Sequence, residues 1–494
     1  MHGCSAYTVR TPHPNDRASR KAEYDTLRVW PIAWIVNYMK KVGFVSLGCP
    51  KNLVDSEVMM GQLAEAGYQI TNNANEADTV VVNTCGFIES AKQESVDAIL
   101  EATRWKSDGK ASRVIVAGCL VERYRDDLMK ELPEVDAFIG TSQVMDILKA
   151  ADDKFDAKKL TITPIGNKSA TYLYDEYTPR MRATESHTAF VKIAEGCDRP
   201  CAFCSIPAMR GSFRSRRFGS IIEEARQLAK QGVKEIVLIA QDSSRYGEDL
   251  GEVDALAALI RALGEIDGIE WIRPMYAFPT HISDAFLSAI AETPKAVKYL
   301  DMPLQHASRN VLKLMKRGGT RESLERLIAR VRAAVPGIAI RTTFITGFPG
   351  ETDEDFEELI KFVRNCRFDN LGVFTYSDEE GTAAYDLPNK VDPRIAKQRR
   401  NRLMKEQAKI SKQINSSRIG QTFKLMFEGL SQESDLLFQG RLQGQTQEID
   451  GYILINDMPP DLDPKIGEIY DVRINEAHEY DLVGEILSPA FVGK

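Results

Sequence analysis

The sequence predicts an α/β protein in three parts: an N-terminal parallel α/β domain, a central partial (β/α) barrel and a small antiparallel β-barrel at the C-terminus. In the first two parts, short runs rich in Val, Ile and Phe alternate with helical patterns, which is typical of βα units and parallel sheets. After about residue 418, short strand patterns separated by glycine turns follow one another, which favours a small barrel. The length of 494 residues has room for about two to four domains.

The first predicted domain, residues 40–150, contains three apolar runs that are each followed by a cysteine. The runs cover residues 42–47, 79–82 and 113–117, and the cysteines are Cys49, Cys85 and Cys119. Because an open α/β sheet binds its ligand beyond the carboxyl ends of its strands, we expect these thiols to converge. The alternatives are three unrelated thiols or a structural zinc site, although zinc needs a fourth ligand and this domain contains no His.

The central part, residues 183–415, alternates six strand patterns with helices, which predicts a partial (β/α) barrel. The strand patterns cover residues 187–194, 235–240, 269–276, 297–302, 338–345 and 370–376. Cys197, Cys201 and Cys204 follow the first strand pattern at spacings of three and two intervening residues. Catalytic groups of such barrels lie at the carboxyl ends of the strands, so this loop is the predicted centre of the chemistry.

Three neighbouring thiolates are typical ligands of an iron–sulfur cluster. Since a [4Fe–4S] cluster has four irons, three cysteines leave one iron open. An open iron can hold a substrate or cofactor, whereas a fully ligated cluster only stores an electron. The structural alternative is that the three cysteines pack as small apolar side chains.

The cysteine spacing, with the aromatic Phe203 before the last cysteine, resembles the radical S-adenosylmethionine (SAM) superfamily, in which SAM chelates the open iron. The resemblance implies that the loop after the fifth strand borders the adenosine of SAM and that polar residues at other strand ends lie near SAM or substrate. The candidate SAM-binding residues are Phe203, Gln241, Asp242, Gln305, Arg341 and Gly347. An ordinary loop or cap function is the alternative for each of them.

Residues 46–57, Ser-Leu-Gly-Cys-Pro-Lys-Asn-Leu-Val-Asp-Ser-Glu, resemble the signature of methylthiotransferases, and residues 302–308 agree with their RimO-type branch. The tRNA-modifying branch typically has Gln-Met-Asn where this chain has Pro-Lys-Asn. The resemblance implies that the first three cysteines hold a second, auxiliary [4Fe–4S] cluster. Asn52, Asp55 and Ser56 are neighbours of this cluster or, for Asp55 and Ser56, the N-terminal cap of the next helix.

The resemblance covers roughly residues 40–489. It implies an enzyme that adds a methylthio group to the β-carbon of an aspartate in protein twelve of the small ribosomal subunit. An unactivated C–H bond has no usable pKa, and in this family a 5′-deoxyadenosyl radical, made from SAM at the Cys197/Cys201/Cys204 cluster, removes the hydrogen. The auxiliary cluster delivers sulfur, a second SAM supplies the methyl group, and flavodoxin or ferredoxin is the expected electron donor.

Two alternative functions share some of these features. A tRNA (adenosine) methylthiotransferase has both cluster motifs, but the Pro50-Lys51-Asn52 run and the acidic tail argue against it. A non-catalytic iron–sulfur electron-transfer or RNA-binding protein is the other. Two three-cysteine motifs beside a barrel able to hold SAM argue against that alternative.

The end of the chain combines a basic helix with an acidic barrel. Residues 390–418 predict a basic amphipathic helix that ties two domains together, with a nucleic-acid contact as the alternative. Residues 418–489 resemble the TRAM domain, which often binds RNA in relatives. Residues 418–494 nevertheless hold 6 Lys and Arg against 14 Asp and Glu, a net charge of −8. This charge repels phosphate and attracts a basic protein, which makes tRNA the less favoured substrate.

Residues 1–38 contain an apolar run interrupted by Pro31 and show no small-residue cleavage site. We expect a non-native or disordered N-terminal extension there, and not a signal peptide. The chain carries 64 Lys and Arg against 71 Asp and Glu, and it has no run of 18 apolar residues. Its eight cysteines cluster by motif, so we expect reduced thiols and a cytoplasmic protein without a membrane partner.

Overall fold

The computed structural model describes residues 39–155, 172–431, 434 and 436–489, so the predictions for residues 1–38 lie outside the described residues. The chain folds into two compact units. The first is described over residues 39–86, 90–155 and 179–183, and the second comprises the other described residues. Residues 183–415 and 418–489 lie almost wholly in the second unit, so their division into separate domains stays a prediction. No helix in the described part of the chain is long and apolar enough to cross a membrane.

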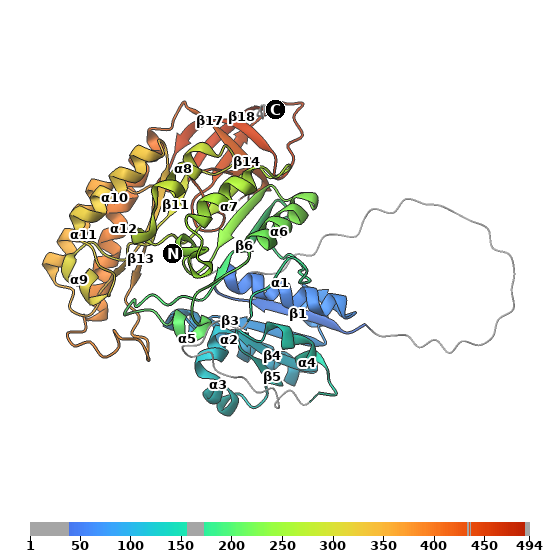
Figure 1. Cartoon of the computed structure of the whole chain (residues 1–494). Coiled ribbons are helices and arrows are strands. Elements are labelled where there is room, and N and C mark those ends of the chain that lie inside the picture. Colours follow the sequence, from blue (N-terminus) through green and yellow to red (C-terminus); the bar gives the residue numbers. More distant parts are fainter. Residues whose placement is uncertain (1–38, 156–171, 432–433, 435, 490–494) are drawn as a thin grey trace, which may run out of the picture. The chain divides into compact units, whose positions relative to one another are not determined.

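The first unit is a five-stranded parallel sheet with the strand order β2-β1-β3-β4-β5. Its strands are β1 Lys41–Ser46, β2 Gln69–Thr71, β3 Thr79–Thr84, β4 Arg113–Gly118 and β5 Ala137–Ile139. Its helices are α1 Pro50–Glu65, α2 Glu89–Ser107, α3 Cys119–Glu131 and α4 Ile147–Ala151 (Figure 1). The three predicted strands are confirmed, whereas β2 and β5, with three residues each, are too short to show a pattern in the sequence. The strand order reverses between β1 and β3, and open α/β sheets bind ligands in the crevice at such a point.

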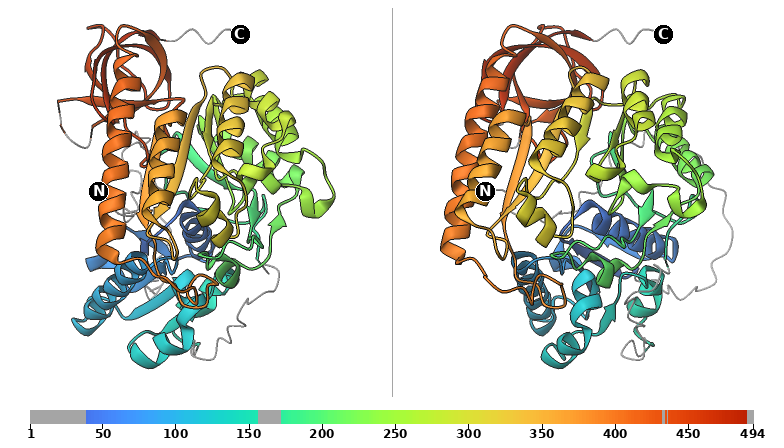
Figure 2. Two further views of the ribbon diagram at one scale, coloured as in Figure 1. Left: turned by 90° about the vertical axis from the view of Figure 1, so that its left-hand side faces the viewer. Right: turned by 60° about the vertical axis from the view of Figure 1, so that its left-hand side comes forward.

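The second unit contains the predicted partial barrel of parallel strands (Figure 2). Its strands are β6 Thr188–Lys192, β9 Glu235–Ile239, β10 Trp271–Pro274, β11 Tyr299–Asp301, β12 Ala339–Thr346 and β13 Asn370–Thr375. The two halves, β6-β9-β10 and β11-β12-β13, are joined at Ile272, whose N–H donates to Lys295 O (2.8 Å) and whose carbonyl accepts from Val297 N–H (3.0 Å). The spatial order of the strands therefore follows the chain, as consecutive βα units require.

Helices cover the outer face of these strands, and their apolar sides share one hydrophobic core with them (Figure 2). These helices are α6 Phe218–Lys230, α7 Ala255–Gly264, α8 Asp284–Glu292, α9 Arg309–Leu314, α10 Arg321–Ala334, α11 Asp353–Cys366 and α12 Pro393–Ser416. The short helix α5 Ile206–Arg210 follows the cysteine loop and lies outside this core. Helix α12 is the predicted basic amphipathic helix. Its Leu403 and Ile410 belong to the core, and its Arg399 donates to the Asp353 carboxylate (2.7 Å) at the start of α11.

The C-terminal part is a closed five-stranded barrel with the order β14-β15-β16-β18-β17. Its strands are β14 Thr422–Leu430, β15 Phe438–Leu442, β16 Ile453–Asp457, β17 Ile469–Ala477 and β18 Leu482–Pro489. Leu425, Val472 and Ile474 are among the side chains that fill it. The predicted barrel is confirmed, with one correction. The β16–β18 pairing is parallel, whereas the other four pairings are antiparallel as expected.

A buried network of charges joins the C-terminal barrel to the amino ends of the central strands. Arg441 of β15 donates to Glu235, the first residue of β9 (2.6 Å), and to Glu428 of β14 (2.6 Å). Arg273 of β10 donates to the other oxygen of Glu235 (2.7 Å). Burial acts to raise the pKa of Glu235, but the two guanidinium groups outweigh it and lower this pKa to about 2. The barrel therefore lies at the amino ends of the strands, opposite to the end at which the central cysteines follow β6.

Replacing Arg441 by Met leaves the Glu235 carboxylate buried with one partner lost, so we expect the free energy of unfolding to fall by about 3–5 kcal/mol. Urea unfolding followed by tryptophan fluorescence measures this, since Trp271 lies 6.0 Å from the Arg441 guanidinium. Arg473→Met is the matched control, because it breaks an exposed ion pair of about 0–1 kcal/mol. Because the folded pKa of Glu235 is depressed from 4.5 to about 2, the stabilisation is complete above about pH 4.5 and is lost as the pH falls toward 2. Equal losses in the two variants would contradict the prediction.

Candidate active site

The cysteine loop, residues 197–204, follows β6 and is fixed by backbone hydrogen bonds to two distant segments. The Ala202 N–H donates to Met315 O (3.0 Å) just after α9, and Ala202 O accepts from the Ala384 N–H (2.7 Å) beyond β13. The predicted position at the carboxyl end of a barrel strand is therefore observed. Hydrogen bonds from two distant segments hold the loop at Ala202, so the positions of its thiols depend on the tertiary structure as well as on the local sequence.

Burial keeps two thiols of the cysteine loop from ionising by themselves. It raises the pKa of Cys197 to about 11 and that of Cys204 to about 12. The thiolate is the form that binds a metal. These side chains therefore become ligands at neutral pH only when a cation compensates their charge.

Arg317, which sequence reasoning missed, supplies a positive charge beside Cys201, the remaining thiol of the cysteine loop. Its guanidinium donates to Cys201 Sγ (3.6 Å) and to Pro303 O (2.6 Å). It also stacks over the Phe278 ring, with 4.2 Å between the guanidinium carbon and the ring centre. No spacing rule points to this contact, because Cys201 and Arg317 are 116 positions apart.

Two of the predicted SAM contacts, Gln241 and Asp242, directly follow β9, the neighbour of β6. Gln241 Nε2 donates to Glu195 (2.6 Å), whereas its buried Oε1 has no hydrogen-bond partner among the described residues. Asp242 is buried and accepts from Arg199 of the cysteine loop (2.8 Å). The structure therefore brings both residues to the loop, and Gln241 Oε1 can accept a hydrogen bond from a ligand.

Phe203 and Gln305 also lie at this end of the barrel. Phe203, on the cysteine loop, packs edge-to-face on Phe348 with 6.4 Å between ring centres. Gln305 follows β11 in the left-handed region (φ 71°), and its backbone pairs with β12 through Thr343 O and the Ile345 N–H, both at 2.8 Å. A residue other than glycine in this conformation costs on the order of 1 kcal/mol, and such residues cluster at functional sites.

The other two predicted SAM contacts have evident structural partners. Arg341 lies in the first half of β12 and pairs with Asp301 (3.0 Å) and with Asp450 of the C-terminal barrel (3.5 Å). A Cβ added to Gly347, whose φ is 78°, would lie 2.3 Å from Ala396 Cβ, so the approach of α12 already requires glycine there. Their function in SAM binding stays a prediction.

The first unit brings Cys49, Cys85 and Cys119 to one edge of its sheet, because they follow the neighbouring strands β1, β3 and β4. Cys49 is the N-cap of α1, and Cys119 is the first residue of α3. Helix N-termini stabilise negative charge, so both positions suit the charged ligands of a cluster. Gly48 makes the approach of the first two possible: its φ is 91°, and a Cβ there would lie 2.8 Å from Cys85 Cβ.

Buried polar side chains hold these strand ends together. Asn52 Nδ2 donates to Leu47 O after β1 (2.7 Å) and to Thr84 O at the end of β3 (3.2 Å). The Ser56 hydroxyl accepts from Asn83 Nδ2 (2.9 Å). Because α1 begins at Pro50, the alternative that Asp55 or Ser56 caps this helix is wrong.

Three family models match the chain in order. They are the uncharacterized protein family UPF0004 over residues 41–140, the radical SAM superfamily over 191–363 and the TRAM domain over 419–487. Each match lies within one of the parts predicted from the sequence, whose bounds stay a prediction.

Curated relatives match the chain almost from end to end. The ribosomal protein uS12 methylthiotransferase RimO of Solibacter usitatus is 52% identical, with 91% of this chain and 95% of the relative covered. Its counterparts in Koribacter versatilis and Desulforamulus reducens are 48% and 46% identical, each over 91% of this chain and over 96% and 100% of the relative. The chain belongs to this RimO family. It is therefore an enzyme of the radical SAM methylthiotransferase type, and SAM and [4Fe–4S] clusters are its cofactors, as predicted.

Among solved structures, the radical SAM methyltransferase TsrM from Kitasatospora setae aligns with a TM-score of 0.48 and 14% identity, covering 68% of this chain and 72% of that chain. The assignment to the RimO family rests on the curated relatives.

That the two cysteine sets of this RimO family member hold the iron–sulfur clusters stays a prediction, and their thiol donors suit such clusters. No group of three or more His, Cys, Asp or Glu side chains in the described part of the chain is close enough to hold a metal ion. A single zinc ion needs four converging ligands. A [4Fe–4S] cluster instead takes its thiolates on separate irons, so its ligands surround a larger body.

We expect Gly48→Ala to disturb the first-unit cysteines, because the new methyl group meets Cys85. Gly67→Ala is the matched control: Gly67 has nearly the same φ, 90°, but no atom within 4 Å of an added Cβ. Both variants take on strain of about 1–2 kcal/mol. After anaerobic reconstitution, only Gly48→Ala should lose bound iron and sulfide, as measured by elemental analysis. Equal iron contents in the two variants would show that the close approach does not shape a cluster site.

We expect Arg317→Met to lower the reduction potential of the cluster at Cys201. A donor to a thiolate stabilises the reduced, more negative state, and a hydrogen bond to a charged group contributes about 1.5–3 kcal/mol. That is on the order of 60–130 mV for one electron, measured by a redox titration followed by electron paramagnetic resonance. Arg326→Met, an exposed position near Arg317, is the control and should leave the potential unchanged. An unaltered potential in Arg317→Met would contradict the prediction.

Proposed function

We propose that this chain methylthiolates ribosomal protein uS12 at the β-carbon of an aspartate. The observation that carries the proposal is the agreement with RimO relatives of up to 52% identity over 91% of the chain. Both cysteine sets lie within the matched parts of the chain. When bound, SAM and the clusters supply a 5′-deoxyadenosyl radical that can open an unactivated C–H bond, and the sulfur and methyl group that replace the hydrogen.

The side chains of the two units have separate tasks in this proposal. Cys197, Cys201 and Cys204 hold the cluster that binds SAM, and Cys49, Cys85 and Cys119 hold the auxiliary cluster. Arg317 compensates the charge of the Cys201 thiolate, at which it already donates a hydrogen bond. Gln241 Oε1 accepts from SAM because no described residue satisfies it. Phe203, Asp242, Gln305, Arg341 and Gly347 are the further proposed SAM-binding residues.

The charge of the chain supports a protein substrate. The tail from residue 418 has a net charge of −8, which attracts a basic ribosomal protein and repels a phosphate backbone. The TRAM match is compatible with an RNA contact, but the RimO relatives do not favour tRNA as the substrate. We propose a cytoplasmic site of action, where ribosomes are made, and flavodoxin or ferredoxin as the electron donor.

The test is an anaerobic reaction of the reconstituted enzyme with SAM, dithionite and either uS12 or tRNA, followed by mass spectrometry. We expect the methylthio mass gain on uS12 alone. Cys201→Ala should abolish formation of 5′-deoxyadenosine, whereas Cys85→Ala should keep it and end sulfur transfer. A mass gain on tRNA with none on uS12 overturns the substrate. If Cys85→Ala still forms methylthio product, the proposal that the first-unit cysteines hold the sulfur-delivering auxiliary cluster is wrong.

A further inference from the structure

A strongly basic segment, whose surface we call the α9–α10 face, lies in an otherwise acidic chain. Residues 309–332, which contain α9 and most of α10, carry eight Lys and Arg against two Asp and Glu. The whole chain has 64 Lys and Arg against 71 Asp and Glu. The excess of six positive charges in one short segment therefore calls for an anionic partner.

Half of these cations are exposed and form no ion pair in the part of the chain that the structure describes. Exposed cations without an ion pair among the described residues are Arg309, Lys313, Lys316 and Arg326. The two glutamates of the segment are both engaged by Arg321, and Arg330 pairs with Asp284 (2.8 Å). The face thus keeps a net positive charge toward solvent.

The turn between α9 and α10, which belongs to the α9–α10 face, contacts the cysteine loop directly. The turn between α9 and α10 contains Met315, whose carbonyl accepts from the Ala202 N–H (3.0 Å), and Arg317, which donates to Cys201 Sγ (3.6 Å). A molecule bound on α9 and α10 is therefore separated from a cluster ligand by a single side chain.

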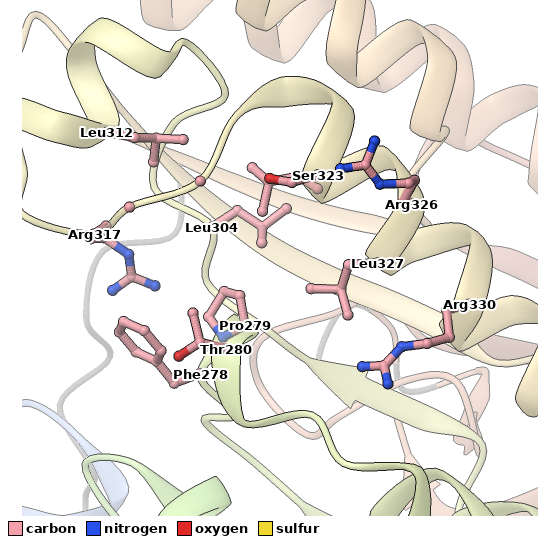
Figure 3. Close-up of a pocket in the computed structure, with 13 residues that line it drawn as sticks. Phe278, Pro279, Thr280, Leu304, Leu312, Arg317, Ser323, Arg326, Leu327 and Arg330 are labelled. Atoms are coloured by element: carbon pink, nitrogen blue, oxygen red, sulfur yellow. The ribbon is translucent and has the colours of Figure 1, made fainter.

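A cavity of about 380 Å³ opens on the same face (Figure 3). Its apolar lining includes Phe278, Leu304 and Leu327, and the guanidinium groups of Arg317, Arg326 and Arg330 surround it. An apolar centre with a cationic rim matches a protein whose contact face has an apolar centre and an acidic rim. A nucleic acid fits it less well, because its contacts are mostly to phosphate.

We propose that the α9–α10 face docks the protein that reduces the cluster at Cys197, Cys201 and Cys204: a small acidic carrier of a low-potential, one-electron centre. The inference rests on the proposed function, because reductive cleavage of SAM needs one electron from outside the chain. In the docked complex the carrier loses one electron and the cluster gains it, and no bond or proton changes at the docking face. Charge attraction brings the carrier to the face, and Arg317 lies between the face and the cluster ligand.

The test compares a protein reductant with a chemical one in the cluster-loaded full chain. The variant is Lys313→Glu combined with Lys316→Glu and Arg326→Glu. The control reverses three exposed cations of α12, Lys397, Lys405 and Lys412, and so changes the net charge equally. With reduced flavodoxin below saturation, the rate of 5′-deoxyadenosine formation should fall on the order of tenfold in the variant only, and its salt dependence should flatten. With dithionite, all three proteins should react at the same rate.

Calorimetric titration of flavodoxin into each protein measures docking without catalysis, and only the α9–α10 variant should bind more weakly. An unchanged affinity and rate with flavodoxin overturn the proposal, as does an equal loss with dithionite, which signals a structural defect. The proposal is also wrong if the α9–α10 variant, with dithionite as reductant, modifies free uS12 normally but modifies uS12 in assembled ribosomal subunits more slowly. That result would assign the face to RNA binding. If the parent cleaves no SAM with dithionite, the proposed function fails, while the titration still decides the docking.

Discussion

Both sets of cysteines depend on one geometric constraint: parallel strands deliver the residues that follow them to the same edge of a sheet. In the first unit, β1, β3 and β4 are neighbours, so Cys49, Cys85 and Cys119 reach one edge although whole helices separate them in the sequence. In the second unit, the cysteine loop follows β6, and Gln241 follows the neighbouring β9. The close packing of backbone at Gly48 and the hydrogen bonds of Asn52 then fix the strand ends more tightly than the sheet alone does.

In the second unit, the buried ion pairs that stabilise the fold and the thiols of the candidate site lie at opposite ends of the strands. At the amino ends of its strands, Arg441, Glu235 and Arg273 compensate one another in a buried network that holds the C-terminal barrel in place. At the carboxyl ends, burial raises the pKa of the Cys197 and Cys204 thiols, and the Arg317 guanidinium donates to the remaining thiol, Cys201. Buried charge without a partner is costly, so a site built this way favours the binding of a cationic group such as an iron–sulfur cluster.

The distribution of charge over the chain matches the variety of molecules that the reaction needs. The tail is acidic and suits the proposed basic ribosomal protein, whereas the α9–α10 face is basic and suits the proposed acidic electron carrier. A chain with evenly mixed charge would attract neither, and the small net charge of the whole protein conceals this division. Complementary local potentials steer partners to separate surfaces more than they raise affinity.

The α/β class, the six central strands and the final barrel follow from the sequence by itself, because the hydrophobic period is a local property. The six candidate cluster cysteines were also found this way, because their spacing and their places after strand patterns are local. The sequence also pointed to Gln241 and Asp242, since residues directly after a strand have a predictable place. Only the tertiary structure decided which distant groups meet. Arg317 contacts Cys201 from 116 positions away, and Arg341 turns to Asp450 of the barrel. Such contacts arise from the packing of whole elements, which leaves no period or spacing in the sequence.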